Sequence, residues 1–306
     1  MLAALLIACG AEPAVDTEPA DMRLDAAAYP APADGARWLG PDVTIEPGTE
    51  RQYCLFGTWT GPDVGLYAYA SHQASIGHHL VLLGTTASAQ DYPDGTVVDC
   101  TDTGSLMTSF SPLITPEPIG QGETAITLPD GFAVKLRDGQ RWIVQAHYVN
   151  TLPDPVRVQD VLTLAWRPED EVSTWAAALA LNHDSFELGP QQETTSGIDC
   201  SFDEPLQVLS LTGHMHEHGL RFDFSAGPDA ESLTPIVEMP TWEREYRDNP
   251  PVTRFAPGEL TLPANAVLRT TCTWFNDSDA TLGFPEEMCT TAGMVYPSLT
   301  TRICSR

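Results

Sequence analysis

The sequence predicts an all-β protein in two domains. Short runs rich in β-branched and aromatic residues recur along the chain, bounded by Pro, Gly, Asp and Asn, which is typical of antiparallel sandwiches or barrels. The 26 prolines and 23 glycines are scattered, which disfavours long helices. With 306 residues the chain is long enough for two domains, since one domain usually has about 100–200 residues.

Eight segments carry the strand pattern most clearly: 65–70, 80–84, 124–128, 142–149, 161–166, 206–211, 220–224 and 267–275. Residues 175–181 are Ala-rich and have helical propensity, but the run is short and ends at Asn182, so we expect another strand there. Residues 167–171 are polar and turn-like. They indicate a boundary between an N-terminal domain, 38–168, and a C-terminal domain, 169–306.

The balance of charges excludes some partners. The chain has 42 acidic and 15 basic side chains, a formal net charge of −27, and a single lysine, Lys135. Binding to nucleic acid needs clustered Lys and Arg, and docking on an anionic lipid surface needs a basic patch. We therefore expect neither. No stretch reaches the roughly 18 apolar residues of a membrane span.

The N-terminus has the features of a bacterial export signal. Residues 1–9 form a short apolar run, and 6–10 (Leu-Ile-Ala-Cys-Gly) resemble a lipobox, which implies lipidation of Cys9. The basic residues that usually open such a signal are missing, so an ordinary cleaved signal or a miscalled start are the alternatives. Residues 10–37 are acidic, without a hydrophobic period, and we expect a flexible tether.

The seven cysteines predict the compartment. No CxxC motif occurs, and six well-spaced cysteines follow the N-terminal one. This pattern predicts three disulfides and therefore an oxidising compartment. Together with the N-terminal segment, it places the protein in a bacterial cell envelope, lipid-anchored or secreted, with contact to the membrane only through the lipid.

Three histidines in the first half are candidate metal ligands. His78 and His79 are adjacent, and adjacent residues face opposite sides of a regular strand. For both to reach one metal, the strand must bulge or the rings must use different nitrogens, and Gly77 permits such an irregularity. His147, within an apolar run, would supply the third ligand from a distant strand.

A second group lies in the other half. His214 and His216 are two residues apart, so in a strand they face the same side and can bind one metal. The sequence leaves their partner open, and the downstream candidates are Met288, Met294, Cys289 and acidic residues. Three other histidines we do not expect to be ligands: His218, because Gly219 suggests a turn, and the isolated His72 and His183.

Four motifs in this order resemble a known family: Gly77-His78-His79-Leu80, Gln145-Ala146-His147-Tyr148, His214-Met215-His216-Glu217-His218-Gly219 and Glu287-Met288-Cys289. The pattern is similar to that of the type II copper, ascorbate-dependent monooxygenases, the family of peptidylglycine α-hydroxylating monooxygenase and dopamine β-monooxygenase. The resemblance covers roughly residues 40–304. It implies two tandem antiparallel β-sandwich domains, jelly-roll-like, each with one copper, and a cleft between the two sites.

The resemblance also implies roles for individual residues. His78, His79 and His147 match the ligands of the electron-transfer copper, and His214, His216 and Met288 match those of the oxygen-binding, catalytic copper. The family's disulfide pairing implies Cys54–Cys100, Cys200–Cys304 and Cys272–Cys289. Imidazole suits copper in both oxidation states, and a thioether favours Cu(I).

The implied reaction is hydroxylation of a C–H bond with O2 and a one-electron reductant such as ascorbate. In peptide-hydroxylating members an arginine two residues before the HxH motif binds the substrate carboxylate, and a tyrosine lies four residues after the methionine. Here these positions are Thr212 and Ala292, so we expect a neutral or cationic organic substrate. The alternatives are a non-catalytic copper-binding or buffering lipoprotein, and an adhesive pair of β-sandwiches with incidental histidines.

Overall fold

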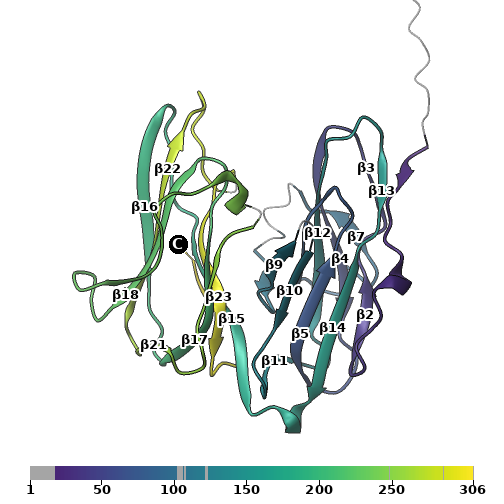
Figure 1. Ribbon diagram of the computed structural model, residues 1–306, viewed down its shortest axis with the longest axis horizontal. Coiled ribbons are helices and arrows are strands. Elements are labelled where there is room, and N and C mark those ends of the chain that lie inside the picture. The colour runs from purple at the N-terminus through teal and green to yellow at the C-terminus, as the bar shows by residue number, and fades with distance from the viewer. Residues whose placement is uncertain are drawn as a thin grey trace, which may run out of the picture.

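The computed structural model describes residues 18–101, 106, 108–120, 123–247, 249–284 and 286–305. Two assemblies of β-strands stand side by side, the N-terminal one coloured purple to teal and the C-terminal one green to yellow (Figure 1). Among the described residues, the helical elements with assigned bounds are three single-turn 3-10 helices: η1 (Ala26–Ala28), η2 (Glu169–Glu171) and η3 (Arg244–Arg247). The prediction of an all-β protein is confirmed.

The N-terminal half contains strands β1 (Ala20–Asp21), β2 (Gly35–Leu39), β3 (Val43–Ile45), β4 (Thr49–Thr58), β5 (Val64–His72), β6 (Gly77–Thr85), β7 (Val97–Asp99), β8 (Phe110–Pro112), β9 (Glu117–Gly120), β10 (Glu123–Thr127), β11 (Phe132–Leu136), β12 (Arg141–Asn150), β13 (Val156–Val158) and β14 (Val161–Pro168). One sheet has the order β7-β4-β12-β6-β8, and the sheet opposite contains β2-β14-β5-β11 with β10 and β9 beside β5. Alternate residues of both sheets fill the core between them, as a sandwich requires.

The C-terminal half contains β15 (Thr174–His183), β16 (Gln192–Cys200), β17 (Leu206–His214), β18 (Gly219–Gly227), β19 (Thr234–Met239), β20 (Val252–Arg254), β21 (Leu260–Leu262), β22 (Val267–Asn276), β23 (Cys289–Tyr296) and β24 (Arg302–Ser305). The sheet β16-β22-β18-β19 faces a sheet built on β15-β23-β17. A second hydrophobic core, which includes the buried Trp274, lies between them.

The two halves are packed against each other. β11 of the first half pairs in parallel with β15 of the second, so one sheet runs through both sandwiches, as the base of Figure 1 shows. Met294 and Tyr296 of β23 belong to the hydrophobic core of the N-terminal half. The hydroxyl of Thr115 donates a hydrogen bond to the carbonyl of Gly293 at 3.2 Å. These contacts give the two halves a fixed apolar interface.

The expected strands are confirmed, including the Ala-rich segment, which forms β15. The expected flexible tether is wrong for residues 18–37: β1 pairs with β13, and β2 pairs with β14 along its whole length. An edge strand needs only free backbone partners, so the missing hydrophobic period did not exclude it. Met22 also packs on the core, and Tyr29 stacks on His72 at a centroid distance of 4.2 Å. Residues 1–17, with Cys9, lie outside the described residues.

All three implied disulfides are present: Cys54–Cys100, Cys200–Cys304 and Cys272–Cys289. Each joins segments that are distant in the chain, which constrains the unfolded state. Disulfides of this kind form and persist in oxidising surroundings, and they indicate an extracytoplasmic compartment. In the described part of the chain, none of the helices has the length and apolar composition that crossing a membrane requires.

Candidate metal centres

The first histidine group is brought together by a β-bulge. His79 of β6 lies opposite His147 of β12, and the next pair in the register is Gly77 with Tyr148, so His78 is the extra residue. The bulge turns two adjacent histidines toward the same neighbour, as the sequence requires if both bind one metal. Gly77 matters here for space, because a Cβ at this position would lie 2.3 Å from the Cβ of Gln73.

The geometry of this triad suits a metal ion. One ligand atom from each of His78, His79 and His147 lies within 4.8 Å of the others, and the Nδ1 atoms of His78 and His79 are 3.1 Å apart. The Nε2 of His147 is 2.8 Å from a carboxylate oxygen of Glu50. Its Nδ1 is buried and has no hydrogen-bond partner among the described residues. A buried nitrogen of this kind is costly to leave unpaired, and a metal would satisfy it.

The electrostatics of the triad favour neutral rings. Burial, assisted by the charges of His147 and His78, lowers the pKa of His79 well below its ordinary value. Burial and the charge of His78 lower the pKa of His147 to about 4, against the opposing effect of Glu50. At neutral pH these two rings are therefore uncharged, which is the state that binds metal. Burial alone would raise the pKa of Glu50, but His147 and Arg247 together have the larger effect and bring this pKa below its ordinary value. Glu50 is therefore ionised at neutral pH.

The second group lies where β17 ends. His214 is the last residue of β17 and pairs with Thr290 of β23, and the ring centroids of His214 and His216 are 5.1 Å apart. The Nδ1 of His216 donates to the carbonyl of Glu286 at 2.9 Å, which leaves its Nε2 for a ligand. Met288 is half-buried and directly follows Glu286 and Glu287, both of which contact His216, so the chain carries it close to this histidine.

Glu287 holds this second group in place, and sequence reasoning gave it no role. Its carboxylate is fully buried and accepts the backbone N–H groups of His216 at 3.0 Å and His218 at 2.7 Å. It also accepts the indole N–H of Trp274 at 3.2 Å. The only sequence signal was its position between a predicted ligand and the disulfide-bonded Cys289. A buried carboxylate with several N–H donors fixes the path of the chain around it.

The remaining histidines have other partners. The Nδ1 of His218 lies 3.1 Å from Asp277, so its ring is paired with a carboxylate. His72 pairs with Glu123 at 3.0 Å, and the Nε2 of His183 lies 2.7 Å from the hydroxyl of Ser196. That none of these three histidines binds a metal stays a prediction.

The surroundings of the two groups are connected across the boundary between the halves, because Arg247 donates both to Glu50, the partner of His147, and to Glu217, the neighbour of His216. The charges of His214 and Arg247, both in the C-terminal half, are among the causes that, after burial, lower the pKa of His79. Such effects need proximity, because charge interactions weaken with distance and are screened by water. The fold therefore brings the group of His78, His79 and His147 and the group of His214 and His216 to the same region of the molecule.

The positions that bind carboxylate in the resembling family are occupied differently. Thr212 and Ala292 are paired across β17 and β23, and the Thr212 hydroxyl donates to the carbonyl of Pro251 at 2.9 Å. Two arginines of the C-terminal half that could bind a carboxylate instead have carboxylate partners of their own, Arg221 with Asp223 and Arg269 with Asp199.

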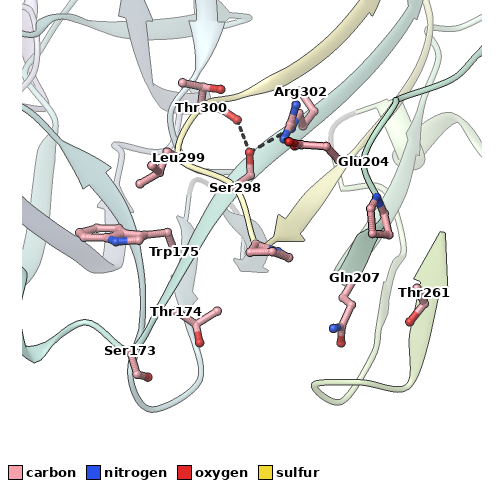
Figure 2. Close-up of a pocket in the computed structure, with 12 residues that line it drawn as sticks. Ser173, Thr174, Trp175, Glu204, Gln207, Thr261, Ser298, Leu299, Thr300 and Arg302 are labelled. Carbon is pink, nitrogen blue, oxygen red and sulfur yellow. Dashed lines mark hydrogen bonds and ion pairs between the residues drawn. The ribbon is translucent and has the colours of Figure 1, made fainter. Parts of the chain in front are cut away.

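A cleft of about 930 Å³ lies at the opposite end of β17. Figure 2 shows Trp175 and Leu299 on one side and Gln207 and Thr261 on the other. Its polar groups bind each other: Arg302 donates to the hydroxyl of Ser298 and pairs with Glu204. Seven residues of extended strand, about 23 Å, separate Gln207 from His214. This cleft is therefore distinct from the histidine groups.

A scan against protein-family models finds no match, and a comparison with curated proteins finds none either. Among solved structures, one match is the VP2 subviral particle of infectious bursal disease virus, which is 11% identical to this chain. The match covers 91% of this chain and 75% of the VP2 chain, with a TM-score of 0.22. The Gx strain of the same virus is also 11% identical and covers 88% and 75%, with a TM-score of 0.21. Such low TM-scores carry no argument about fold or function.

Proposed function

We propose that this protein is a copper-dependent monooxygenase that hydroxylates a C–H bond of a neutral or cationic organic substrate. The observation that carries the proposal is the pair of ligand groups with different donors. One group has three imidazoles, including the orphaned Nδ1 of His147. The other has His214 and His216, with Met288 next to Glu287, whose carboxylate accepts the backbone N–H of His216, and supports the resemblance in the motifs.

The donor sets fit copper. His78, His79 and His147 would hold one copper, and His214, His216 and Met288 the other, two per chain. When bound, copper supplies one-electron redox chemistry and activation of O2. The thioether of Met288 is a soft donor that favours the reduced metal, and the all-imidazole group lacks it. The net reaction is R–H + O2 + 2 e⁻ + 2 H⁺ → R–OH + H2O, with ascorbate as the electron donor.

The protein's own groups orient the ligands. Glu50 accepts the Nε2–H of His147 and thereby fixes the tautomer that leaves Nδ1 for the metal. The carbonyl of Glu286 does the same for His216, and Glu287 holds the backbone around it. Thr212 and Ala292 offer no cation, which favours a substrate without a carboxylate.

We also propose that the protein works in a bacterial cell envelope, anchored through a lipid on Cys9. The three disulfides support export, and the lipobox-like segment supports the anchor.

The deciding experiment is oxygen uptake by the full chain with ascorbate, with and without added copper. We expect uptake that requires copper and is lost in His147→Ala, with two coppers bound by the wild type and one by this variant. Asp170→Asn, at an exposed position in η2, is the matched control and retains both metals. Two bound coppers without oxygen uptake would favour a copper-buffering protein instead, and a preference for zinc would contradict both.

A further inference from the structure

Arg247 connects the two candidate metal groups across the boundary between the halves. It belongs to η3, the short green coil on the side of the C-terminal sandwich that faces the N-terminal one (Figure 1). Its Nη2 donates to Oε1 of Glu50 in β4 at 2.8 Å. Its Nη1 donates to Oε1 of Glu217 at 3.0 Å, and Glu217 lies between His216 and His218 in the chain.

The same oxygen of Glu50 serves both neighbours. Oε1 accepts from Arg247 and, at 2.8 Å, contacts the Nε2 of His147. The resulting chain of contacts runs from His147 through Glu50 and Arg247 to Glu217. It begins at a ligand of the first group and ends beside a ligand of the second.

The exposure of these side chains shows which of them needs support. The Glu50 side chain is 46% exposed, that of Arg247 is 22% exposed and that of His147 only 4%. A half-exposed glutamate with a single partner has several rotamers open to it in water, and ordering it costs conformational entropy. A planar guanidinium that is itself fixed between two carboxylates restricts that freedom, which a single ammonium group does less well.

We propose that Arg247 is a positioning residue for the histidine triad: it holds Glu50 against His147 and ties that contact to the second histidine group. This proposal depends on one part of the proposed function, namely that the triad binds copper. It adds a residue from the other half of the chain to the environment of the triad, and makes the geometry of that site depend on how the halves are docked.

The test is Cu(II) binding to the triad, followed by calorimetric titration and by electron paramagnetic resonance. All variants are made in full-length His214→Ala protein, so that copper binds the triad alone while Glu217 is unchanged. We expect Glu50→Gln to weaken binding about tenfold, as loss of a partner that orients a histidine ligand does. Arg247→Gln should weaken it several-fold and change the spectrum in the same direction, and Arg247→Lys should fall between Arg247→Gln and the parent.

The decisive comparison is the double variant. If Arg247 acts through Glu50, Arg247→Gln has no further effect on affinity once Glu50→Gln is present, whereas independent contributions would add.

Two controls separate this role from general stability. Arg244→Gln changes an exposed arginine of the same short helix. Arg254→Gln removes another ion pair between the halves, the one with Glu117. Both should leave the affinity and the spectrum of the triad unchanged.

Three results would overturn the proposal: parental affinity and spectrum in Arg247→Gln, an additive loss in the double variant, or an equal loss in Arg254→Gln. A different result would count against the proposed function instead. If the His214→Ala protein bound no copper, or bound it equally well after His147→Ala, the triad would not be a copper site.

Discussion

At the scale of single residues, the two proposed metal sites differ in one donor. The first would have three imidazoles, and in the second the thioether of Met288 would take the place of the third. Soft sulfur stabilises Cu(I) relative to Cu(II), and nitrogen does so less. In the proposed function, the residue at position 288 therefore sets which oxidation state of copper the second site would prefer.

We expect Met288→His to keep copper and to lose most oxygen-dependent turnover. Imidazole replaces one ligand with another, so binding survives, but the preference for the reduced metal declines. The measurements are copper content and ascorbate-supported oxygen uptake. Met294→Leu is the matched control: this methionine is fully buried in the interface between the halves, so its loss lowers stability and spares copper. Unchanged turnover in Met288→His would mean that the Met288 side chain contributes packing contacts and does not bind copper.

Asp160 is a buried acidic residue that contacts Tyr148, the neighbour of His147 in the chain. It is fully buried, and its carboxylate accepts from the hydroxyl of Tyr148 at 2.6 Å and the amide of Gln73 at 2.9 Å. Burial raises its pKa from 3.8 to about 6, against the effect of these hydrogen bonds. The folded state thus binds more protons than the unfolded state between those values, so this group makes the protein less stable as pH rises from about 4 to 6.

Asp160→Asn should remove that pH dependence. A shift of about two pKa units corresponds to about 3 kcal/mol at most, so the variant should gain up to this amount, relative to wild type, between pH 4 and pH 7. The measurement is the free energy of unfolding by urea at several pH values, with the exposed Asp170→Asn as control for the loss of one charge. A constant difference between Asp160→Asn and wild type across this range would contradict the assignment.

At the scale of elements, local rules predicted some features and not others. Adjacent histidines face opposite sides of a regular strand, so the sequence predicted either a bulge or the use of different ring nitrogens, and the register of β6 and β12 shows the bulge. Alternation and turn residues predicted many of the strands, but not β4, β11 and β23, which also lie inside their sheets. The same rules missed β1 and β2, because a strand at an edge is held by backbone hydrogen bonds that leave no hydrophobic period.

The bulge in β6 depends on the space that Gly77 leaves. We expect Gly77→Ala to lower stability by about 1–3 kcal/mol and to weaken copper binding at the triad, because the new methyl group would lie 2.3 Å from Gln73 Cβ. Thermal unfolding and copper titration measure the two effects. Gly61→Ala is the control, since its nearest neighbour would be 3.5 Å away, an ordinary contact. A stable Gly77→Ala protein with full copper affinity would show that the bulge tolerates a side chain.

At the scale of the whole molecule, the docking of two sandwiches creates contacts that no local pattern contains. Glu50 is 97 residues from His147 and 197 residues from Arg247 in the chain, yet its carboxylate contacts both. Glu287 similarly reaches residues about 70 positions away. The proposed ligands could be named from the sequence, since their spacing and residue types carry the signal. Their supporting residues were not, because ordinary acidic and basic side chains acquire these roles only in the folded arrangement.

The charge of the whole molecule, together with the pairing of its arginines, bears on the substrate. The formal net charge is −27, which repels anions at long range, although salt screens this effect. Arg221, Arg247 and Arg269 each donate to carboxylates of the protein itself. A substrate carboxylate would have to compete with these partners. Thr212, at the position where the resembling family has its arginine, already donates its hydroxyl to a backbone carbonyl.

We therefore expect poor hydroxylation of peptides that end in a free glycine carboxylate. Losing a charge-assisted hydrogen bond costs about 1.5–3 kcal/mol, which corresponds to roughly one to two decades in binding. The measurement compares ascorbate-supported turnover of a glycine-extended peptide with that of its carboxamide and of a phenethylamine-type amine, at low and high salt. The carboxamide or the amine should be the better substrate, and high salt should narrow the difference, because it screens long-range repulsion but supplies no missing cation. Strong selectivity for the free carboxylate would mean that one of the paired arginines exchanges its partner for the substrate.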